Sequence, residues 1–361
     1  MCVAMEQEFL VSTPAPRKAW DTLIGNCPKS LIYTTPQWMD CVTGVERMVD
    51  ASRFYEFSNG KQAIVPLIRR AMGCKPLSVL ASMPRGWGQG GLIAHPELNK
   101  HEVIAILNDL RRLGYMQISI RPNPLDVNLW KGLGGSFDSI IEHSTHILNI
   151  SGGFGHFWSK TLDSPTRNKI RKGEKSGLVI ECDTTGQAID DFYRIYLRWN
   201  DNRARDRKFP VLFYRWLARR REPLEKFRRV SQSFDGNCQI WTAKLNRVPV
   251  ASAILLTHSI HAFYWRSHSD KALAGPTRAN EVLQKYMIEE ACKRGCLYYH
   301  MGESGGVPSL IHFKEKFGAV RYFYNEYVFE NLPLTELRQS FQRLIKRIEE
   351  KYIALGKADF I

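Results

Sequence analysis

The chain has 361 residues, of which 44% are hydrophobic and 24% are charged, and its formal net charge is +15. This length predicts two domains, and the balanced composition excludes a disordered or fibrous protein. The apolar runs are too short to span a bilayer, and the N-terminus lacks the basic start and apolar stretch of a signal peptide. We therefore expect a cytoplasmic protein. The positive charge predicts an anionic partner, which leaves RNA, a phosphate-bearing cofactor, a nucleotide-linked sugar and an anionic membrane leaflet open.

The eight cysteines do not form a metal-binding pattern. Only Cys292 and Cys296 lie near each other, and no histidine pair with zinc-finger spacing accompanies them. We expect no metal ion, and unpaired thiols of this kind are typical of a reducing compartment.

The sequence of the first half predicts strands, helices and one glycine-rich turn in a definite order. These elements are strands at 61–70 and 77–83, a turn at 84–91, a helix at 99–114, a strand at 115–121, a short helix at 128–135 and a strand at 136–150. The turn, "PRGWGQGG", lacks the Lys-Ser or Lys-Thr of a phosphate-binding loop. We interpret it as a mobile turn that borders a ligand cleft.

Two helical segments join the halves. Ser164 and Pro165 begin a helix that carries Arg167, Arg171 and Lys175 on one face, which is either a solvated surface or a contact for phosphate or RNA. Residues 188–224 then predict two amphipathic helices that are broken near Pro210, and we assign the aromatic residues of the first to the core.

The second half repeats the order of the first. Its predicted elements are strands at 237–248, 248–258 and 260–268, a helix that follows Pro276 and Thr277 and ends before Gly295, a strand at 296–301, a helical turn at 309–318 and a strand at 319–330. Trp130-Lys131-x-x-x-Gly135 aligns with Phe313-Lys314-x-x-x-Gly318, which indicates an internal duplication. We expect lobes at 1–150 and 151–330, followed at 331–361 by an amphipathic helix that docks on the body or, alternatively, lies on a membrane surface.

Common hydrolase, zinc-protease and nucleotide-hydrolase motifs are missing. The sequence has no Gly-x-Ser-x-Gly, His-Glu-x-x-His, Walker lysine loop or Gly-x-Gly-x-x-Gly after a strand. These enzyme classes therefore have no support from motifs.

Five segments follow one another in a characteristic order. They are "RNKIRKGEKSGL", "KFPVLFYRWL", "AFYWRS", "GPTRANEVLQKYMIEEACKRG" and "HMGESGG…FKEKFGA". In this order they resemble the FemAB family and its acetyltransferase-like relatives of the GNAT fold. The resemblance covers about residues 150–330 well and the first half more loosely. It implies an α/β (α+β) fold of two tandem GNAT-like lobes, each a mixed, mostly antiparallel sheet flanked by helices.

The resemblance also implies a site. In the GNAT fold an acyl donor enters where two strands part, and 260–268 would be one of these strands. Lys314 would supply positive charge to the oxyanion or to an anionic substrate, Phe313 would line the acyl site, and Glu303 or His300 would accept a proton. The candidates for binding are Tyr264, Trp265, Arg266, Arg278, Asn280, Arg167 and Arg171.

The function implied is transfer of an acyl or aminoacyl group to an amine of a cell-envelope precursor or an amino sugar, with acyl-CoA or aminoacyl-tRNA as donor. The chain lacks the coiled-coil arm of some tRNA-dependent members and the pyrophosphate loop of acetyl-CoA members, so the donor stays open. The expected partners are a nucleotide-linked or lipid-linked acceptor, tRNA or the inner membrane face, and not DNA. The alternatives are acyl-CoA dependent N-acetylation of a small amine and non-catalytic binding of RNA or an anionic surface.

Overall fold

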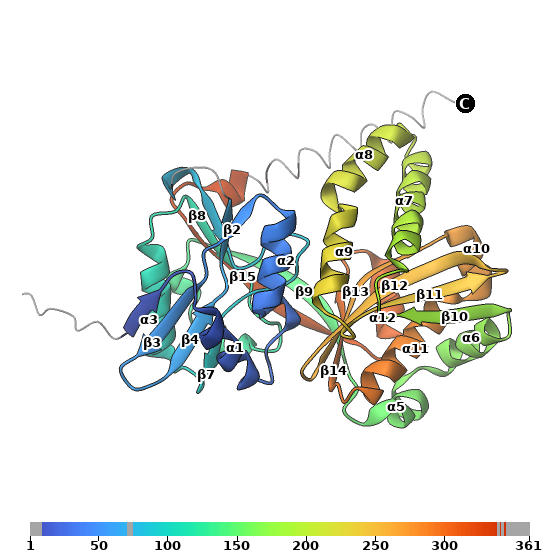
Figure 1. Ribbon diagram of the computed structural model, residues 1–361, viewed down its shortest axis with the longest axis horizontal. Helices are drawn as coiled ribbons and strands as arrows, with labels where there is room; N and C mark the ends of the chain where they lie inside the picture. The colour runs from blue at the N-terminus through green and yellow to red at the C-terminus, as the bar shows by residue number, and fades with distance from the viewer. Residues whose placement is uncertain (1–8, 71–74, 338–339, 341–342, 344–361) are drawn as a thin grey trace, which may run out of the picture.

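The computed structural model describes residues 9–70, 75–337, 340 and 343 (Figure 1). The helices of the first half are α1 (Arg17–Gly25), α2 (Pro36–Val45), α3 (Lys100–Arg111) and α4 (Val127–Trp130). Its strands are β1 (Phe9–Ser12), β2 (Met48–Asp50), β3 (Arg53–Phe57), β4 (Gln62–Val65), β5 (Ile68–Arg70), β6 (Val79–Ala81), β7 (Ile93–His95), β8 (Gln117–Ile120) and β9 (Ser139–Asn149).

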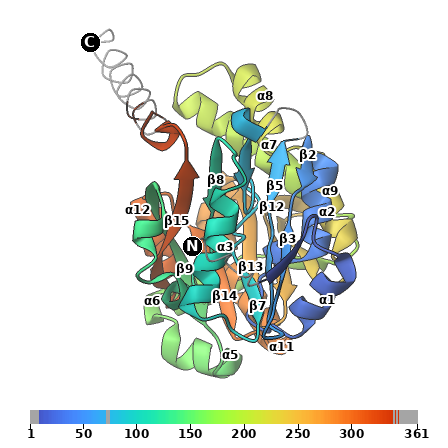
Figure 2. The ribbon, with the colours of Figure 1, turned by 90° about the vertical axis from the view of Figure 1, so that its left-hand side faces the viewer.

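The second half has more helix. Its helices are α5 (Gly153–His156), α6 (Ser164–Glu174), α7 (Ile189–Asp206), α8 (Val211–Arg221), α9 (Leu224–Ser233), α10 (Lys271–Thr277), α11 (Ala279–Lys293) and α12 (Pro308–Glu315). Its strands are β10 (Leu178–Asp183), β11 (Cys238–Leu245), β12 (Val248–His258), β13 (His261–Ser269), β14 (Tyr298–Glu303) and β15 (Val320–Glu330). Helices α7 and α8 form a hairpin that projects from the body in both views (Figures 1 and 2).

One large sheet runs through both halves. Its strand order is β10-β11-β12-β13-β14-β9-β15-β8-β6-β5-β2, and β1, β3, β4 and β7 form a separate antiparallel sheet. A large mixed sheet and a smaller antiparallel sheet, flanked by helices, confirm the predicted fold class.

The same strand arrangement occurs twice, with the last strands exchanged. β6 and β8 are parallel and are joined through α3, and β13 and β14 are parallel and are joined through α11. The strand beside β8 is β15, from the second half, while the strand beside β14 is β9, from the first half. β9 and β15 pair with each other along nine residue pairs, from Ser139↔Val328 to Ile147↔Val320. The two halves therefore share the middle of the sheet.

The helix expected after Pro276 and Thr277 and before Gly295 is confirmed as α11, which begins at Ala279. A short helix that was not predicted, α10, precedes it. Pro276 lies inside α10, and Arg278 adopts a left-handed conformation with φ 57° between α10 and α11. A left-handed residue ends a regular helix because its carbonyl and amide turn away from the helix axis.

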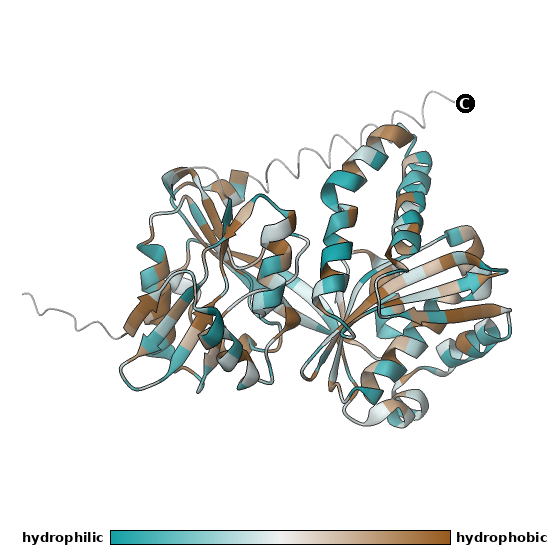
Figure 3. Ribbon diagram, viewed as in Figure 1, coloured by the Kyte–Doolittle hydropathy of each residue, from teal (hydrophilic) through white to brown (hydrophobic). Residues whose placement is uncertain are grey.

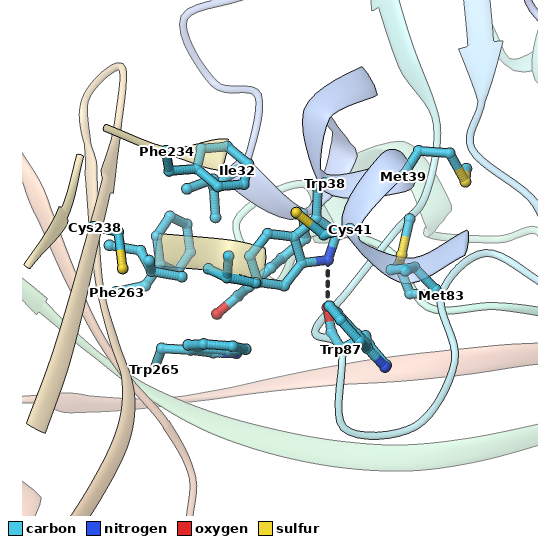
Figure 4. Packing of buried hydrophobic residues seen from close by; sticks show 14 of the residues in the cluster. Ile32, Trp38, Met39, Cys41, Met83, Trp87, Phe234, Cys238, Phe263 and Trp265 are labelled. Atoms are coloured by element: carbon cyan, nitrogen blue, oxygen red, sulfur yellow. Dashed lines mark hydrogen bonds between the residues drawn. The ribbon is translucent and has the colours of Figure 1, made fainter. Parts of the chain in front are cut away.

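Three hydrophobic clusters hold the structure together. One lies within the second half and one mainly within the first. The third joins α1 and α2 to α7, α9 and β11–β13, and Trp38 is at its centre (Figure 4). The indole Nε1 of Trp38 donates to the carbonyl of Trp87 at 2.9 Å, so this cluster also fixes the glycine-rich turn. Most of the amphipathic helix predicted at 331–361 lies outside the described residues.

Candidate active site

β13 and β14 part in the middle of the large sheet. They pair in parallel from His261↔Tyr298 to Phe263↔His300, and in the described structure the pairing ends there. β14 continues against β9, while β13 continues against β12. A bulge opposite Ile254 and Leu255 adds Trp265 as an extra residue to β13, which bends the strand further. The result is a notch in the sheet, where β13 has no strand partner on one side beyond Phe263.

A cleft of about 630 Å³ opens at this notch. The second half contributes β13, the end of β14, and residues of α11 and α12. The first half contributes Tyr33, the glycine-rich turn and Arg121. Both halves therefore form the walls of one cleft.

Eight of the eleven predicted site residues line this cleft. They are Tyr264, Trp265, Arg266, Asn280, His300, Glu303, Phe313 and Lys314. The structure places the other three outside it. Arg167 donates to the carbonyl of Leu162, Arg171 lies over the ring of Trp158, and Arg278 occupies the turn between α10 and α11.

Lys314 is a buried cation at the edge of the notch. It lies on α12, and its Nζ donates to the carbonyl oxygens of Gly302 at 2.7 Å and of Glu303 at 2.9 Å. Burial lowers the pKa of Lys314 to about 8, although the negative charge of Glu303 acts to raise it. The two hydrogen bonds occupy two of the three N–H donors, so the ammonium is held at the end of β14 by the backbone.

Steric contacts explain why the last residue of the Phe313-Lys314-x-x-x-Gly318 motif is a glycine. Gly318 has φ +82°, and a Cβ there would lie 2.3 Å from Cγ2 of Thr161. Phe317 is fully buried in the core beside it, and Phe313 packs partly against the same core. The motif therefore serves packing as well as the position of Lys314.

Glu303 belongs to a chain of hydrogen bonds that crosses the cleft. The hydroxyl of Tyr324 donates to its Oε1 at 2.5 Å, and Nε2 of Gln89 donates to that hydroxyl at 3.2 Å. Burial, and then the charge of Glu303, raises the pKa of Tyr324, so the phenol stays protonated and remains a donor. This places an oriented carboxylate at the cleft.

His300 is buried and neutral. One ring nitrogen lies 3.0 Å from Nδ1 of His261, and its ring stacks on Phe263 with centroids 4.5 Å apart. Burial, with a smaller effect of His261, lowers the pKa of His300 well below its usual value. It is therefore a poor proton acceptor at neutral pH.

A buried charged cluster, which the sequence did not predict, fixes the glycine-rich turn. Nζ of Lys226 donates to the carbonyl of Gly86 at 2.7 Å and pairs with Glu222 at 2.7 Å. Nη2 of Arg266 reaches the same two residues at 2.6 and 2.8 Å. Burial, and then the charge of Arg266, lowers the pKa of Lys226 to about 8. These hydrogen bonds hold the glycine-rich turn against the second half, and Arg266 is one of the residues that hold it. We call Lys226, Glu222 and Arg266 the clamp.

Arg121 is a second cleft residue that the sequence did not single out. Its Nη2 donates to Glu326 at 3.2 Å, and its buried Nε has no partner among the described residues. Burial raises the pKa of Glu326, but the hydrogen bond from His143 and the charge of Arg121 outweigh it and bring the pKa to about 2. Arg121 follows β8 directly, and such a position is visible in sequence only once the sheet order is known.

Two classes of feature are not found in the described part of the chain. No group of three or more His, Cys, Asp and Glu residues there could hold a metal ion. No described helix is long and apolar enough to cross a bilayer.

Comparison with known proteins identifies a domain in the second half. Residues 164–314 match the family model described as an acetyltransferase (GNAT) domain. This segment includes the notch and Lys314, and it confirms the expected GNAT resemblance and supports a transferase of the acyltransferase class. A comparison with curated protein sequences returned no match.

Solved structures share the fold across both halves. FemX is 12% identical, with a TM-score of 0.63 over 91% of this chain and 99% of that chain. The C-terminal domain of a protein from Agrobacterium fabrum, described as a lysylphosphatidylglycerol synthetase, is 11% identical, with a TM-score of 0.52 over 90% and 96%. L-PGS from Bacillus licheniformis is 14% identical, with a TM-score of 0.51 over 90% and 96%. At these identities the likeness concerns the fold.

Proposed function

We propose that this chain, whose residues 164–314 match a GNAT acetyltransferase domain, transfers an acyl or aminoacyl group to an amine of a cell-envelope precursor or an amino sugar. The observation that carries the proposal is the parting of β13 and β14 beside a cleft that contains a buried lysine. Acyl transfer needs little side-chain chemistry beyond positioning, stabilisation of the oxyanion and removal of one proton.

The donor binds in the notch. Its carbonyl accepts hydrogen bonds from backbone N–H groups of β13, and its activating group lies toward the start of α11 near Asn280. The amine nitrogen attacks the carbonyl carbon and forms a C–N bond, and the carbonyl oxygen takes the negative charge. The third N–H of Lys314 and the positive charge of its ammonium stabilise that oxygen.

The second step completes the transfer. The bond from the carbonyl carbon to the sulfur or oxygen of the donor breaks, and the leaving group departs with the electron pair. The attacking amine loses one proton, which the carboxylate of Glu303 accepts, because this group is exposed to the cleft and oriented by Tyr324.

The acceptor binds across the cleft, against the first half. Tyr33, Gln89 and Arg121 provide polar groups there, and the cationic Arg121 favours an acceptor that carries phosphate or carboxylate. The description of one similar structure as a lysylphosphatidylglycerol synthetase favours an acceptor in the cell envelope and an aminoacyl group. We place the reaction in the cytoplasm, where charged tRNA and acyl-CoA occur.

A second candidate is N-acetylation of a small amine with acetyl-CoA. The description of the matching family model as an acetyltransferase domain favours it. The two candidates share the notch and Lys314 and differ in donor and acceptor.

The test is an assay with labelled donors. Labelled acetyl-CoA, longer acyl-CoAs and charged tRNA are each offered with amino sugars, nucleotide-linked amino sugars and lipid-linked peptide precursors, and acylated products are identified by mass spectrometry. We expect one donor class to yield an amide, and Lys314→Met to lower kcat by at least about 100-fold with the thermal unfolding transition retained. No product with any donor, together with salt-dependent RNA binding, would favour the non-catalytic alternative.

A further inference from the structure

Helix α8 exposes a continuous apolar stripe. Phe209, just before the helix, and Leu212, Phe213, Trp216 and Leu217 follow the spacing i, i+3, i+4, i+7 and i+8. This spacing puts side chains on one helix face and is typical of a buried face. Here Leu212 is 79% exposed, Phe213 53% and Trp216 51%. Figure 3 shows the hydrophobic residues gathered at the end of α8 that is farthest from the body.

The stripe lies on a different face of α8 from the one that packs on α7. Ala218 is buried, and its carbonyl accepts a hydrogen bond from the hydroxyl of Tyr196 at 3.0 Å. Arg215 forms an ion pair with Asp201 of α7. These contacts fix the hairpin and leave Leu212, Phe213 and Trp216 without a role in its packing.

Basic residues surround the stripe. From Arg203 to Arg221 the sequence has seven arginines and Lys208 against Asp206, which is eight positive charges and one negative, or +7 of the total +15. Arg219, Arg220 and Arg221 are exposed at the end of α8, and the guanidinium of Arg220 lies 5.3 Å from the ring centroid of Trp216. Such a field selects a negatively charged partner.

We propose that the stripe of α8 is a docking surface for an anionic phospholipid bilayer. Leucine, phenylalanine and tryptophan side chains insert at the boundary between headgroups and acyl chains, and the arginines contact the lipid phosphates. The aliphatic residues favour this partner over single-stranded RNA, which is bound by aromatic stacking platforms and a basic groove. Leu212 is the most exposed residue of the stripe and has no ring to stack on a base.

The hairpin connects this surface to the cleft. Trp199 of α7 lines the cleft. Glu222, which follows α8, accepts a hydrogen bond from the side chain of Arg266, which also lines the cleft. If the acceptor of the proposed function is lipid-linked, docking through α8 holds the cleft near the bilayer. The docking itself does not depend on that function, and its test uses no enzyme activity.

The experiment is co-sedimentation of the full chain with vesicles at two salt concentrations. The vesicles contain either phosphatidylcholine alone or phosphatidylcholine with 30% phosphatidylglycerol. We expect at least about tenfold stronger partitioning to the anionic vesicles, reduced by salt, because each arginine near the surface contributes about fivefold. Leu212→Ser combined with Trp216→Ser should lower this partitioning at least tenfold, and so should Arg219→Gln combined with Arg220→Gln.

The matched control replaces apolar residues that are equally exposed elsewhere. Leu10 and Leu77 are 67% and 73% exposed in the first half, and Leu10→Ser combined with Leu77→Ser should partition like the wild type. Equal binding to both vesicle types, or unchanged binding of the stripe variant, would overturn the proposal. Stripe-dependent binding of a single-stranded RNA without vesicle binding, or stripe-dependent dimerisation in light scattering, would also overturn it and identify the other partner.

Discussion

Lys314 was predicted as a site residue because it lies beside Phe313 in the motif that ends at Gly318. The structure shows which groups surround its side chain. Its side chain is buried, and the backbone carbonyls of Gly302 and Glu303, the last two residues of β14, accept hydrogen bonds from its Nζ. The sequence could indicate the motif but not these acceptors, because they depend on where β14 ends. Its role in the reaction stays a prediction.

The burial of Lys314 predicts how stability changes with pH. Its pKa is about 8 in the folded protein and near the ordinary 10.5 in the unfolded chain, so between these values the unfolded chain binds more protons. The contribution of Lys314 to the free energy of unfolding therefore rises with pH from about 8 to 10.5. Lys226 contributes in the same direction, whereas burial raises the pKa of cysteines such as Cys41, which lowers stability as the pH rises through this range. The free energy of unfolding of the wild type minus that of Lys314→Met, measured by chemical denaturation, should therefore rise with pH, and parallel curves would mean that Lys314 is solvated.

The clamp on the glycine-rich turn predicts a contrast between two lysines. Lys226→Met removes a partner from buried Glu222, and we expect the free energy of unfolding to fall by about 3 kcal/mol. Lys29 pairs with Glu97 at 3.1 Å on the exposed surface, and Lys29→Met should change stability by less than about 0.5 kcal/mol. Urea denaturation measures both. Equal effects of the two substitutions would contradict the proposal that Lys226 stabilises the protein by holding the glycine-rich turn.

At the scale of elements, α6 and α11 approach so closely that a glycine is required. A Cβ on Gly173 would lie 2.6 Å from Cγ2 of Val282 and 2.8 Å from the carbonyl oxygen of Thr277. This contact holds the start of α11, and with it Asn280, at the cleft. The sequence showed α6 as a basic helix and gave no sign of its packing face.

Gly173→Ala should therefore destabilise the protein by about 1–3 kcal/mol through overpacking, although alanine is the better helix former. Gly155 of α5 has open space around its Cβ position, and Gly155→Ala should be neutral or stabilising by up to about 1 kcal/mol. Thermal unfolding of both variants measures the contrast. A neutral Gly173→Ala would show that the two helices can separate at no cost.

Periodicity predicted the elements of the second half well. The strands at β11, β12, β13, β14 and β15 and the break at Pro210 between α7 and α8 are confirmed. Helix α10 was not predicted, and the left-handed backbone of Arg278 that separates it from α11 has no sequence signature. The exposed aromatic residues of α8 were missed as well, because their spacing is that of a buried face.

At the scale of the whole molecule, the resemblance predicted the fold class, but local pattern could not predict the exchange of β9 and β15. Strand order depends on contacts between residues that are far apart, such as Ser139 with Val328. The same exchange places Glu326 of β15 beside Arg121, which lines the cleft, and this explains why the first-half side of the site was not predicted. The division at residue 150 stays a prediction, since one sheet runs across it.

The central claim is that a donor binds in the notch between β13 and β14, and donor-induced stabilisation tests it most directly. Thermal unfolding is followed with coenzyme A, acetyl-CoA, longer acyl-CoAs and charged tRNA for the wild type, for Ser267→Trp, which fills the cleft, and for Ser151→Trp on an exposed turn. We predict that one donor class, at about 100 times its Kd, stabilises the wild type and Ser151→Trp by about 2.7 kcal/mol and has no effect on Ser267→Trp. Stabilisation of all three proteins alike, or of none by any donor, would contradict the account.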